Sequence, residues 1–385
     1  MKNNILFVIG PGRSGTTLLR SLLDNHEELL LWPFEFNIYD LINKIVKKKD
    51  LNYKIKIKDY FYHLKDHFNN LEGEYSADLG KKKYKIINFN FRKFINKFIN
   101  NPNSLTTKEF IFFLRDAYLD CIEKKPKKMK YFIIFHNEPS EYIIRDFPNN
   151  KIILTIRNPI DTYISTKKYY FKSCINTGKD LSTVYRPYSA NSKFKTLLET
   201  SIVPTVYVDN WLNIYKPKNM FKIKLEDLKN NSNLIIENIC NFLNIKKNKS
   251  LFETTFLGQK HFSNLSEYEN TKNVIIKNYT YFKTNEELTI YEFIWLKNIL
   301  KNKKIFGEYT IQDKNLNKNN FNFFKLLKNE LPKLSNEKIV NNKFIYIFRL
   351  FLRLFIFPVN FVLNRYVMLT YDYSILLKKW PINIK

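Results

Sequence analysis

A strand, a glycine turn and a helix follow one another at the start of this chain. Residues 5–9 are an apolar run that Gly10-Pro11-Gly12 ends at once, which predicts a buried strand rather than a helix. The leucines within residues 18–23 then recur at helical spacing. A loop between a strand and a helix N-terminus points its backbone N–H groups at one place, which favours an anion, most often phosphate.

The residues of this loop narrow the choice of anion. Gly10 to Thr17 has the frame of a nucleoside-triphosphate loop, but Thr16 stands where the lysine of such a loop belongs. That lysine and a Mg²⁺ ion hold the triphosphate in those enzymes. The cation here is Arg13, inside the loop. The pattern favours an anion bound without the triphosphate arrangement, with an ordinary glycine turn as the alternative.

A second cation follows another predicted strand. Residues 151–156 are of the type found in a buried parallel sheet, and Arg157 follows them. Asn158 suits a helix N-cap and Pro159 the first helical turn, which places Ser165 near the second turn. The equivalent strand of an NTPase ends in an aspartate that holds Mg²⁺, whereas an arginine favours phosphate. Two such sites on neighbouring strand ends imply a ligand that is phosphorylated at two distant positions.

Together, the segments GPGRSGTTLL and TIRNPIDTYIS resemble the PAPS-dependent sulfotransferases, whose donor is 3′-phosphoadenosine 5′-phosphosulfate (PAPS). The run RSGTTLLRSLLDNH with a later glutamate looks most like the tyrosylprotein and bacterial carbohydrate-type branches. The resemblance implies that the first motif binds the 5′-phosphosulfate and the second the 3′-phosphate. It implies donor contacts at Arg13, Ser14, Gly15, Thr16, Thr17, Arg157 and Ser165, and at Lys260 in the place of a basic loop that closes over the nucleotide.

The resemblance also implies catalytic residues. Glu35 lies at the end of a second predicted strand and inherits the role of general base, and the alternative from the residues alone is a charge on an exposed edge. Many family members carry a lysine before an acidic-Pro pair, where this chain has Asn137 before Glu138. Either His136 substitutes for that lysine or the reaction depends on Arg13.

The expected fold is α/β and P-loop-like, in three layers, with a central parallel sheet and helices on both faces. The donor would lie across the carboxyl ends of the strands. We expect a sulfotransferase domain over residues 1–315, with a cap inserted at about residues 40–103. A basic, apolar helical extension is expected over residues 316–385.

Composition adds weak indications about partners. The net charge of +28 favours acidic ligands, although AT-rich codons would enrich the same residue types. Cysteines at three distant positions suggest a reducing compartment, and no secretory signal opens the chain. We therefore expect a cytoplasmic protein without a nucleic-acid partner. The histidines lack ligand spacing, which predicts no metal site.

The acceptor and the C-terminal extension complete the expectation. The acceptor is expected to be a glycan or glycolipid hydroxyl or amine. Residues 344–363 have nearly the length of a membrane span, but Arg349 and Arg353 interrupt them, which favours docking on a membrane surface over packing on the domain or a true span. The alternatives to a sulfotransferase are an atypical P-loop kinase and a protein that binds polyanions or membranes without catalysis.

Overall fold

The computed structural model describes most of the first 260 residues and a few later positions. The described residues are 4–43, 53–72, 75–76, 83–86, 88–123, 125–126, 128–136, 139–177 and 197–260, with 288, 296, 300 and 309. Asn137, Glu138 and residues 344–363 lie outside this set. Within the described part of the chain, no helix has both the length and the apolar character needed to cross a membrane.

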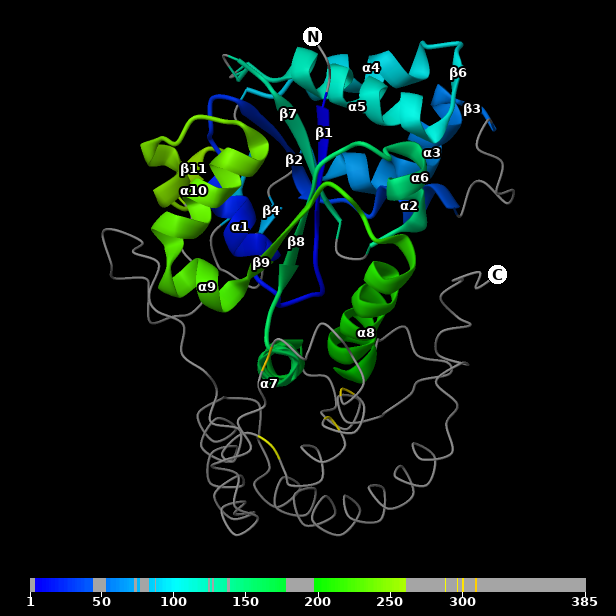
Figure 1. Ribbon diagram of the computed structural model, residues 1–385. Helices are drawn as coiled ribbons and strands as arrows, with labels where there is room; N and C mark the ends of the chain where they lie inside the picture. Colours follow the sequence, from blue (N-terminus) through cyan, green and yellow to red (C-terminus); the bar gives the residue numbers. More distant parts are fainter. Residues whose placement is uncertain are drawn as a thin grey trace, which may run out of the picture.

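A five-stranded parallel sheet forms the centre of the molecule, in the order β2-β7-β1-β8-β9 (Figure 1). The strands are β1 (Asn4–Ile9), β2 (Leu29–Glu35), β7 (Tyr131–His136), β8 (Ile152–Ile156) and β9 (Met220–Lys224). In the ladders, Ile9 pairs with His136 on one side and with Leu154 on the other. The carboxyl ends of β1, β7 and β8 therefore lie at one edge of the sheet.

Helices cover both faces of this sheet, as the sequence predicted. Alternate residues of β1 belong to two different apolar clusters: Phe7 packs with α2 to α8, and Val8 packs with α1, α9 and α10. The helices of the first face are α2 (Ile38–Asn43), α3 (Ile57–Asn69), α4 (Phe91–Ile99), α5 (Thr107–Cys121), α6 (Glu141–Asp146), α7 (Pro159–Thr177) and α8 (Leu197–Tyr215). Those of the second are α1 (Thr16–Leu23), α9 (Leu225–Asn230) and α10 (Ser232–Leu243).

The described part of the chain between β2 and β7 adds an aromatic cluster to the first face of the sheet. It contains α2 to α5 and two short antiparallel pairs, β3 (Ile55–Lys56) with β6 (Ser104–Leu105) and β4 (Tyr75–Ser76) with β5 (Lys83–Tyr84). The rings of Phe68 and Phe94 lie 5.4 Å apart, and Trp32 of β2 lies 6.3 Å from Phe68. This aromatic cluster, to which described residues from the range of the predicted cap contribute, therefore packs onto the sheet through Trp32.

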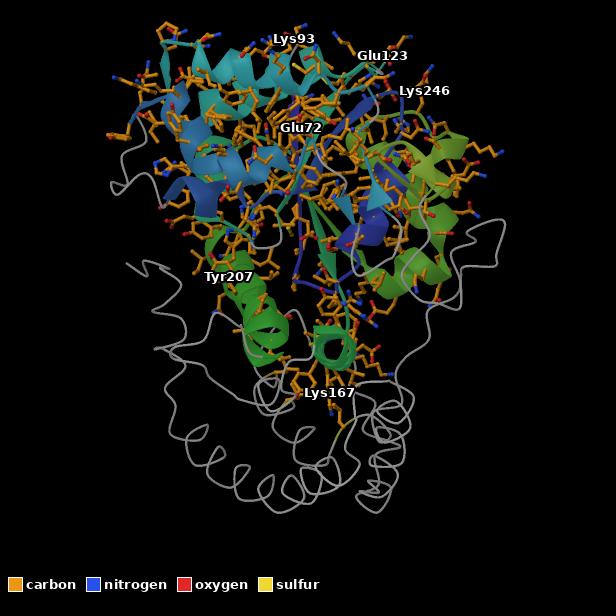
Figure 2. All side chains as sticks on the ribbon, turned by 180° about the vertical axis from the view of Figure 1, so that it is seen from behind. Glu72, Lys93, Glu123, Lys167, Tyr207 and Lys246 are labelled. Atoms are coloured by element: carbon orange, nitrogen blue, oxygen red, sulfur yellow. The ribbon has the colours of Figure 1, made fainter. Side chains whose placement is uncertain are left out.

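The two ends of the molecule are formed by different elements. Figure 2 shows Lys93 of α4 and Lys246, which follows α10, at the end opposite to Lys167 of α7. After α10, the short helix η2 (Lys249–Phe252) precedes a hairpin of β10 (Thr255–Phe256) and β11 (Gln259–Lys260). The strand ends that carry the predicted site point toward α7 (Figure 1).

Candidate nucleotide and catalytic site

The loop after β1 is tightly packed against β8. A Cβ atom on Gly10 would lie 2.1 Å from Thr155 Oγ1, so a glycine is required at this position. The hydroxyls of Ser14 and Thr155 are 2.8 Å apart and buried. Arg13 and Gly15 both adopt positive φ angles, 68° and 99°. For Arg13 this conformation is strained, and such strain is typical of functional loops.

Helix α1 starts directly after this loop. Thr16 and Thr17 are its first two residues, and Gly15 in a left-handed conformation precedes them. The N–H groups of the first helical turn lack intrahelical partners, and the helix dipole adds positive charge there. The geometry therefore fits the predicted anion site at Ser14 to Thr17.

The guanidinium of Arg13 lies against α7. Its Nε donates a hydrogen bond to Ser165 Oγ at 3.3 Å, and its Cζ lies 5.1 Å from the centre of the Tyr169 ring. Ser165 and Tyr169 are one helical turn apart, so they share a face of α7. The structure thus brings Arg13 of the first motif together with Ser165 of the second.

Arg157 joins the two motifs by a second contact. Its Nη1 donates a hydrogen bond to the carbonyl oxygen of Arg13 at 3.3 Å. Asn158 caps α7 as predicted, because its Oδ1 accepts from the backbone N–H of Ile160 at 2.9 Å. The two predicted cations therefore lie at the tips of neighbouring strands, on two segments that contact each other.

A buried carboxylate, which the sequence analysis had not assigned to the site, lies behind this junction. Glu226 of α9 is 3% exposed, and its Oε1 accepts from the backbone N–H of Asn158 at 2.8 Å. Its Oε2 accepts from the hydroxyl of Tyr309 at 3.4 Å. Burial raises the pKa of Glu226, although the Asn158 N–H and the charge of Arg157 oppose that shift.

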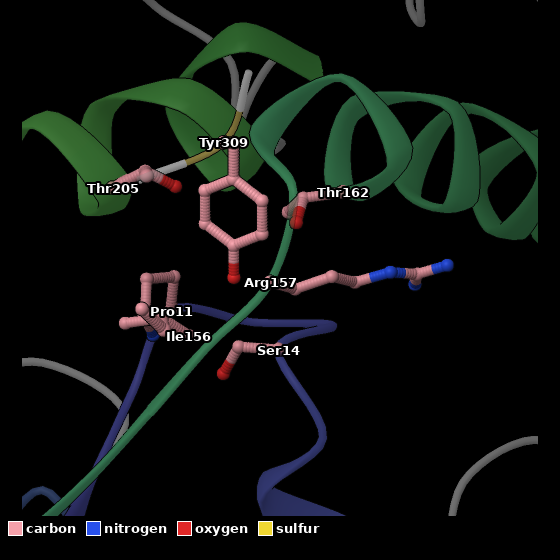
Figure 3. Close-up of a pocket in the computed structure, with 7 residues that line it drawn as sticks. All are labelled: Pro11, Ser14, Ile156, Arg157, Thr162, Thr205 and Tyr309. Carbon is pink, nitrogen blue, oxygen red and sulfur yellow. The ribbon is translucent and has the colours of Figure 1, made fainter. Parts of the chain in front are cut away.

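A pocket opens beside this junction, between the loop, the end of β8 and helices α7 and α8 (Figure 3). Tyr309 stands at its wall, and the Arg157 side chain extends away from the Tyr309 ring. The lining residues are Pro11, Ser14, Ile156, Arg157, Thr162, Thr205 and Tyr309. Lys229 of α9 lies near Arg157. Burial and the positive charge of Arg157 both lower the pKa of Lys229.

Glu35 and His136 occupy the ends of the two strands beyond β1. Glu35 ends β2 and is exposed, whereas Phe34 and Phe36 on either side of it are buried. The exposed end of the edge strand fits both alternatives for Glu35, because it leaves the carboxylate accessible to a substrate as well as to water. His136 ends β7, between Glu35 and the loop, and is buried with its ring centre 6.4 Å from that of Tyr39.

Lys260 lies apart from the residues described so far. It is an exposed residue of β11, and Gly258 in the same hairpin donates its N–H to Asp24 Oδ2 at 2.7 Å. Asp24 follows the C-terminal end of α1, which is the opposite end from the loop. Among the residues described in the structure, no cluster of three or more His, Cys, Asp or Glu side chains is arranged to hold a metal ion.

Comparison with known proteins decides the family. The profile of the sulfotransferase family matches residues 6–249, which is more than half of the chain. The chain belongs to the sulfotransferase family. The match ends before Tyr309, so the Tyr309 hydroxyl comes to this sulfotransferase site from outside the matched segment. No curated protein matches the chain in sequence.

Solved sulfotransferase structures align with much of the chain at low identity. A sulfotransferase domain from the curacin biosynthetic pathway is 16% identical over 65% of this chain and 77% of its own, with a TM-score of 0.38. A sulfotransferase from Alicyclobacillus acidocaldarius is 12% identical over 68% and 87%, with a TM-score of 0.34. A mouse sulfotransferase complexed with PAP is 13% identical over 78% and 84%, with a TM-score of 0.35.

Proposed function

We propose that this sulfotransferase moves a sulfuryl group from PAPS to a hydroxyl or amine of a carbohydrate, either a glycan or a glycolipid. The observation that carries the proposal is the contact between the two basic motifs. Arg157 donates to the Arg13 carbonyl, and Arg13 donates to Ser165, so both cations belong to one connected group of residues beyond the tips of β1 and β8. Two arginines in one connected group suit a nucleotide that carries phosphate groups at both its 5′ and 3′ positions.

The loop and Arg13 would act on the leaving group. In the reaction, the acceptor oxygen or nitrogen forms a bond to sulfur while the bond from sulfur to the bridging oxygen breaks. That bridging oxygen leaves with the nucleotide as adenosine 3′,5′-bisphosphate, and negative charge grows on it. The Arg13 guanidinium and the N–H groups at the start of α1 would stabilise this charge. His136, at the neighbouring strand end, is the second candidate for the same task.

Glu35 would take the proton from the acceptor. Its place at the exposed carboxyl end of the edge strand β2 suits contact with a polar, hydrated acceptor such as a sugar. The parallel sheet supports this assignment, because the carboxyl ends of β2, β7 and β1 share one edge. The sequence resembles both the tyrosylprotein and the bacterial carbohydrate-type branches, so the proposal of a carbohydrate acceptor rests on the exposed position of Glu35.

Titration calorimetry with adenosine 3′,5′-bisphosphate tests donor binding. Arg13→Ala and Arg157→Ala are each expected to weaken binding at least about tenfold, since each removes a charged hydrogen bond worth about 1.5–3 kcal/mol. Glu35→Gln should bind the bisphosphate normally yet transfer no radiolabelled sulfate from PAPS to a panel of glycans. Unchanged affinity in Arg157→Ala, or tight binding of ATP that requires Mg²⁺, would contradict the proposal.

A further inference from the structure

Glu226 connects three distant segments of the chain at one buried point. Its two carboxylate oxygens accept from the Asn158 N–H and the Tyr309 hydroxyl, at 2.8 and 3.4 Å. Asn158 follows β8, Glu226 lies in α9, and Tyr309 lies beyond the part of the chain that matches the family. A buried carboxylate is costly unless donors satisfy it, so this arrangement is an organised network.

The backbone that Glu226 holds is the one that carries Arg157. The Asn158 N–H belongs to the peptide unit that directly follows Arg157, and the Asn158 side chain is occupied in capping α7. Arg157 in turn donates to the Arg13 carbonyl. A movement of the β8–α7 junction would therefore displace Arg157 from the loop, and Glu226 opposes that movement from the buried side.

We propose that Glu226 and Tyr309 are positioning residues that hold Arg157 for recognition of the 3′-phosphate of the donor. The inference rests on the proposed function, because it assumes a donor phosphorylated at both ends. Neither residue needs to touch the nucleotide. Glu226 acts through the Asn158 peptide, and the Tyr309 hydroxyl fixes the second oxygen of the Glu226 carboxylate.

A purely structural role for Glu226 makes a different prediction. Loss of a buried network that serves stability alone would weaken binding of every nucleotide to the same extent. Loss of a residue that positions Arg157 would weaken binding only of nucleotides that carry a 3′-phosphate. The ratio of the affinities for adenosine 3′,5′-bisphosphate and adenosine 5′-monophosphate therefore separates the two roles.

Calorimetry with both nucleotides on the full chain tests the proposal. The wild type should prefer the bisphosphate, and Glu226→Ala should reduce that preference about tenfold. Glu226→Gln should restore most of it, because the Gln carbonyl still accepts from the Asn158 N–H. Tyr309→Phe, which keeps the ring, should reduce the preference about threefold. Glu237 of α10 forms an exposed ion pair with Lys247. Glu237→Gln is therefore the matched control and should leave the preference unchanged.

The possible results separate the inference from the proposed function. A wild type that binds the two nucleotides equally would overturn both. A wild type that prefers the bisphosphate, with the same preference in Glu226→Ala, would overturn the inference and leave the proposed function intact. Should Glu226→Ala fail to fold, Tyr309→Phe decides. A preference reduced about threefold supports the inference, and an unchanged preference overturns it.

Discussion

Arg13 is oriented by an aromatic ring as well as by a hydroxyl. A guanidinium near the face of a tyrosine gains about 0.5–1 kcal/mol at an exposed site. Tyr169 is placed to provide this stabilisation, with its ring centre 5.1 Å from the Arg13 Cζ, while Ser165 accepts from the Arg13 Nε. The position of Arg13, the proposed catalytic cation, therefore depends on Tyr169, which belongs to neither of the two sequence motifs.

We expect Tyr169→Leu to lower the rate of sulfuryl transfer about two- to fivefold, because the loss of about 0.5–1 kcal/mol from Arg13 placement changes a rate by that factor. Tyr169→Phe keeps the aromatic face and should retain the wild-type rate. Steady-state assays with PAPS and a single glycan acceptor measure both variants. Equal losses in the two variants would point to the tyrosine hydroxyl instead of the ring.

Gly10→Ala tests the packing of the loop against β8. The added methyl group would lie 2.1 Å from Thr155 Oγ1 and 2.7 Å from Thr155 O, and both are closer than any ordinary contact. Overpacking of this kind costs about 1–3 kcal/mol. We expect a lower melting temperature together with weaker bisphosphate binding. Pairing Gly10→Ala with Thr155→Ser, which keeps the hydroxyl, should leave the defect, whereas pairing it with Thr155→Ala should partly relieve it.

Local patterns in the sequence were sufficient to predict the local structure around several candidate site residues. The glycine turn, the Asn158 cap and the strand that precedes Arg157 are all specified by neighbours within a few positions, and the structure has them as expected. Glu226 and Tyr309 could not be found in this way, because they meet across 83 residues of chain.

At the scale of elements, the start of helix α5 is fixed by a capping box between Thr106 and Glu109. The Thr106 hydroxyl accepts from the Glu109 N–H at 3.3 Å, and the Glu109 carboxylate accepts from the Thr106 N–H at 2.8 Å. These bonds lower the pKa of Glu109. The capping box was predictable because both of its residues lie within one helical turn.

Thr106→Ala should lower the free energy of unfolding by about 1 kcal/mol, through the loss of an N-cap. Thr106→Ser keeps the hydroxyl and should remain close to the wild type. Urea denaturation followed by circular dichroism measures the difference. An alanine variant as stable as the serine variant would show that tertiary packing, rather than the cap, fixes the start of α5.

At the scale of the whole molecule, Glu28 joins three parts of the fold at the end away from the site. It is buried, its Oε1 lies 2.7 Å from Lys130 Nζ, and its Oε2 accepts from the Lys246 N–H at 2.6 Å. It thus ties the starts of β2 and β7 to the segment after α10. Burial alone would raise the pKa of Glu28, but its bonds to Lys130 and Lys246 outweigh burial and lower it.

A lowered pKa in the folded state predicts sensitivity to acid. The stabilisation from Glu28 is present above the ordinary glutamate pKa and is lost as the pH falls through the lower, folded value. The free energy of unfolding of the wild type should therefore fall more steeply below about pH 4.5 than that of Glu28→Gln. Denaturation curves from pH 3 to about pH 7 measure this slope. Parallel profiles for the two proteins would show that Glu28 does not contribute.

The order β2-β7-β1-β8-β9 also governs how the chain must assemble during synthesis. β1 and β2 are made first, but they are not neighbours, because β7 lies between them. No pair of main-sheet strands forms until the ribosome has delivered residues 131–136, about a hundred residues after β2. Until then the apolar strands β1 and β2 have no partner strand in this sheet. The nascent chain is therefore prone to aggregation at this stage, and we expect chaperones to bind it.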